Sequence, residues 1–376
     1  MRTPEMSLAE KLWQVNWGLL LLLALIGMVG FAVLYSAAGG RMEPWAMRHA
    51  VRFGIFLGLL LAIALIDIRI WMQLAYPIYA VALVMLIAVD VLGVIGMGAQ
   101  RWLDLYVIQL QPSELMKIGL VLALARYYHH VSAENIGRIT HLFVPLGLIV
   151  APVGLVMVQP DLGTAIMLVL SGIGIMFVAG VRLWKFLVAG LAVGGAAPIA
   201  WNMLREYQQN RILTFLDPER DPLGAGYHIT QSKIALGSGG LFGKGFMQGS
   251  QAHLNFLPEK QTDFIFTMLA EEFGMVGGLV VIGLFVCVLL YGFAIALRSR
   301  NHFGRLVAMG ITLTLFLYIF INIGMVMGLL PVVGIPLPLV SYGGTAMLTV
   351  LAACGLLISV YIHRDVTTNR SGSPFG

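Results

Sequence analysis

Charged residues are scarce in this sequence: Lys, Arg, Asp and Glu make up 11% of its 376 residues, whereas 59% are hydrophobic. A water-soluble domain with these proportions could not cover its apolar residues with polar ones. Lipid is the solvent that fits such a composition. The sequence therefore predicts an integral membrane protein and argues against a soluble enzyme.

Cysteine is almost absent as well. Cys287 and Cys354 are the only two, and each lies in an apolar run, where a thiol packs as a small hydrophobe. This usage supports neither a disulfide framework nor a thiolate metal site, and the eight histidines lack metal-ligand spacing. The net charge of +5 comes without a basic run, so nucleic-acid binding is excluded.

Apolar stretches of membrane-spanning length recur along the whole chain, so we expect an all-α fold of about ten transmembrane helices in a single domain, residues 1–376. The first stretch lacks a signal-peptide cleavage site and should remain as helix one. Ser7 and Glu10 have capping-box spacing, which favours a short amphipathic surface helix within 1–16. A frayed terminus is the alternative. The stretches lie near residues 17–35, 48–66, 72–92, 110–127, 141–158, 162–181, 183–201, 264–297, 305–328 and 342–362.

Basic residues predict the orientation, because positively charged loops stay in the cytoplasm. Loops between successive spans lie on alternating sides of the membrane and so form two sets. The short loops of one set hold mainly Arg41, Arg48, Arg52 and Arg101. Both termini, including the tail 363–376, are therefore expected in the cytoplasm, and the long segment 202–262 between helices seven and eight is expected outside. The other, richer set holds Arg2, Lys11, Arg69, Arg126, Arg138, Arg182, Lys185, Arg298, Arg300, Arg305, Arg364 and Arg370.

Two further segments depart from simple spans. Residues 263–300 are too many for one perpendicular crossing, so this helix should tilt or project above the bilayer. The apolar stretch Leu330–Pro338 cannot be regular helix, because its prolines lack backbone donors, and it is expected as a loop buried by protein. Ser341–Thr345 then opens the last helix and is suited to present backbone amides to an anion.

Seven ionisable residues are predicted at or inside the outer half of the membrane, where a charge is costly and commonly marks function. Glu114 and Lys117 are three residues apart on a helix, so a structural ion pair and a functional pair both remain open. Asp161 precedes a helix, and helix capping is the alternative to a functional role. The set is Arg101, Glu114, Lys117, Asp161, Asp263, Glu271 and Glu272.

Asp263 is a lone carboxylate where the polar segment enters an apolar helix, next to Phe264 and Phe266. Partial desolvation by these rings would raise its proton affinity, as a general base for a sugar hydroxyl requires. The competing explanation is that Thr262 or Asp263 caps the helix.

The glycine-rich run 237–245 is not a phosphate-binding P-loop, because Ser238 and Gly245 occupy positions where that motif requires Gly and Ser or Thr. A backbone that makes close approaches explains it better. The cations around it could attract an anionic lipid pyrophosphate, and an ordinary solvated basic loop is the alternative. They are Arg205, Arg211, Arg220, Lys233, Lys244 and Lys260.

Five stretches, in the order in which they occur along the chain, resemble the SEDS family (shape, elongation, division and sporulation). The resemblance covers essentially the whole chain. Two other stretches, Gly226–Lys233 and Ala270–Gly274, look more like the elongation members than the division members. Gln261 departs from the family's usual histidine, so the resemblance gives that side chain no role. The five stretches are Gln111–Lys117, Gln159–Thr164, the glycine run 237–245, Phe256–Phe266 and Asn322–Ala346.

The resemblance implies a glycosyltransferase of the bacterial inner membrane that polymerises undecaprenyl-diphosphate-linked lipid II on the outer face. It implies a class B penicillin-binding protein, similar to PBP2, as partner, together with other elongation proteins. Asp263 matches the family's essential aspartate. A divalent cation, Mg or Mn, is compatible with this chemistry, but no ligand cluster points to one. The supporting positions are Glu114, Lys117 and Asp161, with Arg101, Arg211, Lys233 and Ser341 expected near the substrate.

The sequence leaves three alternatives to this function. A lipid II flippase would use the intramembrane charges as a polar path, although these charges gather on the outer side. The division paralogue would perform the same chemistry at the septum. A pure scaffold would leave the intramembrane charges without a role.

Overall fold

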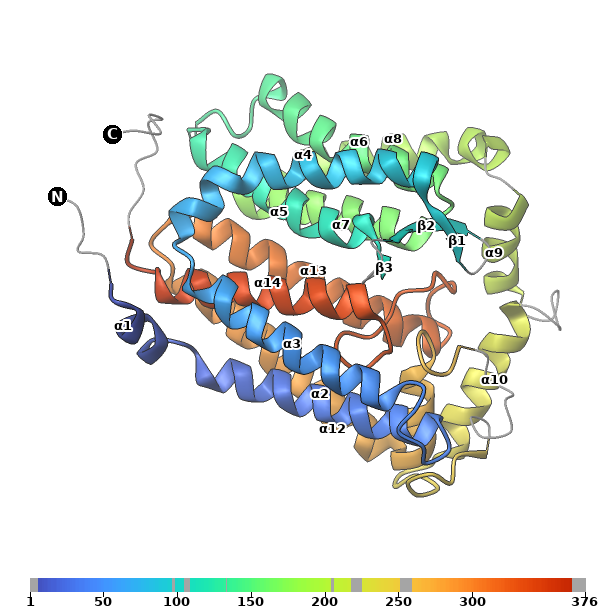
Figure 1. Ribbon diagram of the computed structural model, residues 1–376. Helices are drawn as coiled ribbons and strands as arrows, with labels where there is room; N and C mark the ends of the chain where they lie inside the picture. The colour runs from blue at the N-terminus through green and yellow to red at the C-terminus, as the bar shows by residue number, and fades with distance from the viewer. Residues whose placement is uncertain are drawn as a thin grey trace.

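The structure is a computed structural model that describes residues 6–96, 99–104, 109–132, 134–203, 206–217, 225–250 and 259–366. Long helices run roughly side by side along one axis and form a bundle (Figure 1). The helices are α1 (Leu8–Trp13), α2 (Trp17–Ala37), α3 (Ala46–Leu65), α4 (Ile68–Leu92), α5 (Pro112–His130), the 3₁₀ turn η1 (Ile139–Leu142), α6 (Phe143–Val158), α7 (Leu162–Ala179), α8 (Leu183–Met203), α9 (Glu206–Leu216), α10 (Ala225–Ser238), α12 (Ile265–Arg298), α13 (His302–Val326) and α14 (Gly344–Ile362).

The all-α membrane fold is confirmed. Among the described residues, eight helices are long and apolar enough to cross a membrane. The other two predicted spans are also helices: α5 is more polar and packs inside the bundle, and α8 includes an apolar part, Leu183–Ala196. The count of ten spans stays a prediction. At the N-terminus, Ser7 and Glu10 form the capping box that starts α1.

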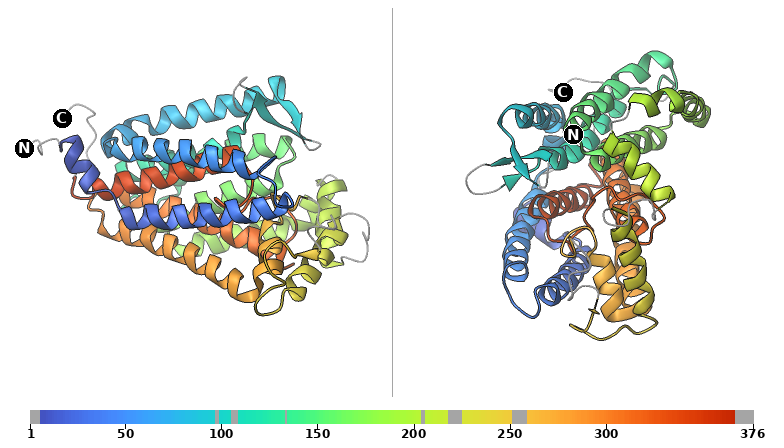
Figure 2. Two further views of the ribbon diagram at one scale, coloured as in Figure 1. Left: turned by 60° about the horizontal axis from the view of Figure 1, so that its bottom comes forward. Right: turned by 90° about the vertical axis from the view of Figure 1, so that its right-hand side faces the viewer.

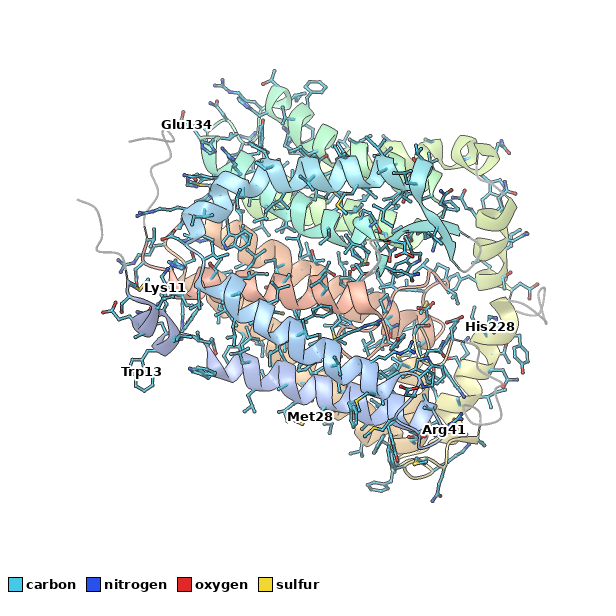
Figure 3. The ribbon with its side chains drawn as sticks, viewed as in Figure 1. Lys11, Trp13, Met28, Arg41, Glu134 and His228 are labelled. Carbon is cyan, nitrogen blue, oxygen red and sulfur yellow. The ribbon has the colours of Figure 1, made fainter. Side chains whose placement is uncertain are left out.

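Helix α1 and the C-terminal end of α14 lie at one end of the bundle, which we call the terminal end (Figures 1 and 2). Helices α9 and α10 and the strands lie at the opposite end, which we call the loop end. Figure 3 shows Lys11 and Glu134 near the terminal end, Arg41 and His228 near the loop end, and Met28 pointing outward from α2. This arrangement agrees with the prediction that both termini lie on the same side of the membrane.

A small three-stranded antiparallel sheet at the loop end was not predicted. Its strands, in the order β1–β2–β3, are Val94–Gly96, Ala99–Asp104 and Gln109–Leu110. The sheet connects α4 to α5 and pairs backbone groups that would otherwise need water. It also places Arg101 on the central strand.

Helices α13 and α14 are largely buried, whereas α3 and α4 expose much of their surface. Small residues allow the inner helices to approach closely, as is common in membranes. A Cβ atom at Gly355 would lie 2.8 Å from the Leu60 carbonyl oxygen, and one at Gly119 would lie 3.2 Å from the Tyr79 Cα. The polar residues of the candidate site, described below, lie on these inner helices and at the loop end.

The excess length of α12 is explained by a break at Gly274, whose φ of 67° and ψ of −165° are not helical. The glycine run replaces the hydrogen bonds that the helix loses there. Met275 and Val276 donate to the Gly240 and Leu241 carbonyls, and the Glu271 and Glu272 carbonyls accept from the Lys244 and Gly245 amides.

The close approach requires glycine on both sides. A Cβ atom at Gly274 would lie 2.3 Å from the Gly243 nitrogen, and one at Gly243 would lie 2.1 Å from the Glu272 carbonyl oxygen. Gly243 also has a positive φ of 81°. The sequence-based inference that this run makes close backbone approaches, rather than binding a nucleotide, thus has a structural explanation.

We predict that Gly274→Ala destabilises the protein, whereas Gly283→Ala in the same helix does not. Alanine at position 274 would add strain on the order of 1–3 kcal/mol at its positive φ, as well as the backbone clash. Gly283 faces open space, so alanine there should be neutral or stabilise α12 by roughly 0.5–1 kcal/mol. Thermal unfolding in detergent measures both, and equal shifts would contradict the proposed contact.

Candidate active site

Asp263 lies in a turn at the loop end, immediately before α12. The residue is half-buried, and its backbone carbonyl accepts a hydrogen bond of 2.9 Å from the Asn322 side-chain amide. One carboxylate oxygen lies near Gly334, where a Cβ atom would be 3.3 Å away. A larger residue at position 334 would therefore press on the carboxylate.

Helix capping does not account for Asp263. Phe264 is the N-cap residue of α12 and provides no side-chain hydrogen bond. The Thr262 hydroxyl donates instead to Glu259, to its carbonyl oxygen and to its carboxylate. Neither Thr262 nor Asp263 therefore occupies the N-cap position that the alternative requires.

The proline-containing segment 327–343 packs against this turn and is not helical, as predicted for Leu330–Pro338. Its part 337–341 is buried, whereas Met327 and Leu329 are exposed. Ser341 donates to the Thr262 carbonyl at 2.6 Å and accepts from the Leu337 amide at 2.8 Å. The Tyr342 amide donates to the Gln261 carbonyl at 2.8 Å. The buried Ser341 hydroxyl thus joins two irregular segments, and its only proton is used in doing so.

Asn322 connects the same two segments to α13. Its amide nitrogen donates to the Asp263 carbonyl and, at 2.7 Å, to the Ile335 carbonyl. The side chain is fully buried, so both carbonyls would lack a partner without it. In the sequence, Asn322 is recognisable only as part of the family signature, because a single buried asparagine gives no periodic signal.

Glu114 and Lys117 form the predicted i, i+3 ion pair on α5, with the Lys117 Nζ 2.5 Å from Glu114 Oε1. Both are buried. Two residues that sequence analysis missed complete the cluster: Tyr318 donates to Glu114 and accepts from Lys117, and Thr349 donates to Glu114 at 3.1 Å. The cluster joins α5, α13 and α14, and its two charged side chains compensate each other.

Asp161 is the N-cap residue of α7, as the capping alternative proposed. Its carboxylate accepts from the Thr164 amide at 3.1 Å and from the Thr164 hydroxyl at 2.9 Å. Gln111, the N-cap residue of α5, donates at 3.3 Å to the same Asp161 oxygen that accepts from the Thr164 hydroxyl. Arg101 donates to the carbonyls of Gln159 and Pro160, so the strand and both helix starts are linked.

Lys233 and Arg211 belong to helices at the loop end, whereas Arg205 and Arg220 lie outside the described residues. Lys233 is an exposed residue of α10, and its side chain lies beside Gly328. The preceding residue, Ser232, is buried and donates to the Val326 carbonyl at 2.8 Å, which attaches α10 to α13. Arg211 belongs to α9, but its side chain lies outside the described part of the structure.

Arg52 was not selected from the sequence, although it contacts the same loop. Its guanidinium lies 5.4 Å from the centre of the Tyr342 ring. Gly344 makes room for it, because a Cβ atom there would lie 3.0 Å from the guanidinium. Among the described residues, none accepts a hydrogen bond from Arg52, which makes this guanidinium a candidate for binding an anion.

Hydrogen bonds therefore connect four stretches that are distant in the sequence. The Gln111 and Asp161 stretches meet through their side chains, Thr345 donates to the Gln109 carbonyl at 3.0 Å, and Ser341 joins Thr262. Within the described residues, no group of three or more His, Cys, Asp or Glu side chains is arranged to hold a metal ion.

A family model described as "Cell cycle protein", covering FtsW, RodA and SpoVE, matches residues 14–366. The chain belongs to this family. It is 46% identical over 357 residues to the peptidoglycan glycosyltransferase MrdB of Escherichia coli K12, covering 93% of both chains.

Two solved structures are similar throughout. One, with a TM-score of 0.81 and 34% identity over 93% of this chain and 98% of that chain, comes from work described as "Structural coordination of polymerization and crosslinking by a peptidoglycan synthase complex". The other is the rod shape determining protein RodA of Thermus thermophilus, with a TM-score of 0.70 and 31% identity over 93% of this chain and 97% of that chain. These comparisons confirm the SEDS resemblance and the fold.

We predict a large energetic coupling between Glu114 and Lys117. Glu114→Gln or Lys117→Met alone leaves a buried charge without its partner, which costs about 3–5 kcal/mol. The double variant leaves no such charge, so it should cost about 1–3 kcal/mol less than the sum of the two single variants. Unfolding in detergent measures this cycle.

The exposed pair Arg300–Asp365, whose charged atoms lie 3.6 Å apart, provides the matched control. The cycle of Arg300→Met and Asp365→Asn should give a coupling of about 0–1 kcal/mol, since solvent screens surface pairs. Equal coupling in the two cycles would refute the view that the Glu114–Lys117 pair is held by its burial.

Proposed function

We propose that this protein is a peptidoglycan glycosyltransferase that polymerises lipid II into glycan strands during cell elongation. The observation that carries the proposal is the convergence of four distant sequence stretches around Asp263 at one end of a membrane bundle. The names of the relatives, MrdB and the rod shape determining protein RodA, support this activity and favour the elongation role over the division role.

Asp263 is proposed as the general base. Its carboxylate takes the proton of the acceptor 4-hydroxyl, the hydroxyl oxygen attacks C1 of the donor sugar, and the C1–oxygen bond to the pyrophosphate breaks. The leaving group departs as an anion, so it needs cations rather than an acid. This chemistry agrees with one dominant carboxylate, whereas glycoside hydrolases use two that flank the bond.

We infer two roles for the cations near the site: three that were predicted from the sequence, and Arg52, which was not. The donors of Lys117 and Arg101 are used by Glu114, Tyr318 and backbone carbonyls, so these residues are proposed to position the site. Arg52 and the exposed Lys233 are better placed to meet a pyrophosphate, because their charges are less committed to the protein.

An apolar cavity in the bundle favours the proposal that the substrate is linked to a lipid. It has a volume of about 300 Å³ and lies between α3, α4, α5 and α14, with Ile63, Val81, Leu115 and Leu356 among its lining residues. Its lining is apolar, as a polyprenyl chain requires. Leu115 and Ile118 line it from the helix that carries Glu114 and Lys117, so a bound chain would run beside the ion pair.

The loop end is proposed to face outward from the bacterial inner membrane, with both termini in the cytoplasm. Connections at the terminal end carry more basic residues than those at the loop end, as the positive-inside rule requires of the cytoplasmic side. A class B penicillin-binding protein is the proposed partner, because polymerised strands need crosslinking. The similarity to a chain from a synthase complex supports such an assembly.

We predict that Asp263→Asn reduces glycan polymerisation by about 10²–10⁴-fold, which is the usual contribution of a general base. Gel analysis of products from labelled lipid II, with the penicillin-binding partner present, measures this. Asp67→Asn is the matched control at the terminal end, where Asp67 caps α4 and asparagine caps equally well.

Polymerisation by Asp263→Asn at the control rate would refute the assignment of the base. Lipid II translocation in liposomes, measured on the same samples, tests the flippase alternative. A transporter should retain translocation in the Asp263→Asn variant and should form no glycan in either protein. Unchanged thermal unfolding shows that each variant is folded.

A further inference from the structure

The glycine run exposes large apolar side chains, although it belongs to the polar connection between α10 and α12. Phe242 is 80% exposed, and its neighbours Leu241, Phe246 and Met247 are exposed as well. A loop in water has no reason to present four such residues together. We call Leu241–Met247 the apolar loop.

The surface of the apolar loop continues onto the lipid-facing side of α12. Phe246 and Phe273 lie 6.0 Å apart between ring centres, and Met275, Val276 and Leu279 are exposed next along the helix. Two backbone hydrogen bonds, Met275 to Gly240 and Val276 to Leu241, fix the loop to this part of α12. The exposed apolar surface is therefore continuous from the loop to the helix.

The length of α12 places this contact at the edge of the hydrocarbon core. The part from Met275 to Leu297 has no charged residue and, at about 1.5 Å per residue, is roughly 35 Å long. The hydrocarbon core is about 30 Å thick. Arg298 marks one edge, and Glu271 and Glu272 with the break at Gly274 mark the other.

The backbone and the charges of the apolar loop are also suited to this depth. Irregular backbone is tolerated in lipid only when protein groups form hydrogen bonds with it. At the break in α12, the Glu271 and Glu272 carbonyls accept hydrogen bonds from the Lys244 and Gly245 amides. Lys244 turns inward, where its Nζ lies 2.7 Å from Glu271 and also from Ser250. Glu272 is buried behind it and accepts from Ser36 at 2.5 Å.

We propose that the apolar loop is a membrane anchor that inserts Phe242 and Phe246 at the boundary between headgroups and acyl chains. Its ligand is the phospholipid of the leaflet at the loop end. Aromatic side chains favour this zone. The anchor holds the first part of α12, Ile265–Phe273, in place, and this segment begins two residues after Asp263. The inference concerns membrane depth and stands whether or not Asp263 is the base.

Site-directed spin labelling in nanodiscs tests the proposal. Only Cys287 and Cys354 need replacement by alanine before single cysteines are introduced. Phe242→Cys and Phe246→Cys report on the loop, Leu279→Cys is the lipid reference, and Glu134→Cys, in an exposed turn at the terminal end, is the water reference. Collision rates with oxygen, which enters lipid, and with a water-soluble nickel chelate give the depth of each label.

Labels at 242 and 246 should collide with oxygen several-fold more often, relative to nickel, than the label at 134, and should approach the ratio at 279. Ratios equal to that at 134 would overturn the proposal. Labels that are open to nickel in nanodiscs and shielded only after the penicillin-binding partner is added would assign this surface to protein instead, which also overturns it. Quenching of bimane at the same positions by lipids with brominated acyl chains gives an independent measure of contact with lipid.

Discussion

The side-chain amide of Asn322 holds the irregular loop end against a regular helix. Inside a membrane protein, each backbone carbonyl without a partner costs several kcal/mol, so a non-helical segment needs a donor for each buried oxygen. Asn322 supplies two donors, one to the turn of Asp263 and one to the segment 327–343. Ser341 adds a second link between the same two segments. The position of the Asp263 carboxylate depends on these few bonds.

Helix α13 extends this support into the ionic cluster. Tyr318 and Asn322 are four residues apart and therefore share one face of the helix. Tyr318 contacts Glu114 and Lys117, whereas Asn322 contacts the turn of Asp263. One rigid helix thus connects the buried charges to the proposed base. The cluster has no net charge, which makes its burial tolerable, and its hydrogen bonds across α5, α13 and α14 fix their relative positions.

Much of the fold was predictable, because spanning helices are encoded by long apolar runs and because only helices leave no backbone group unpaired in lipid. The Glu114–Lys117 pair and the capping role of Asp161 were also predictable, since both depend on residues close in the sequence. Tyr318, Thr349 and Asn322 were missed as site residues, because their roles depend on packing between distant helices. The sheet that contains Arg101 was missed because its strands are short and lack an extended alternating pattern.

The break at Gly274 connects membrane depth to chemistry. Without the break, the polar first turns of α12 would continue straight into its apolar part. Glu271 and Glu272 would then lie on the same helix face as Met275, which is exposed to lipid. The break frees the Glu271 and Glu272 carbonyls, the glycine run pairs with them, and both carboxylates become buried against Lys244 and Ser36. Asp263 then lies at the loop end, just before α12 and outside its apolar part, Met275–Leu297. A base for an acceptor sugar is needed there, since the sugars cannot enter the hydrocarbon core and the lipid tail cannot leave it.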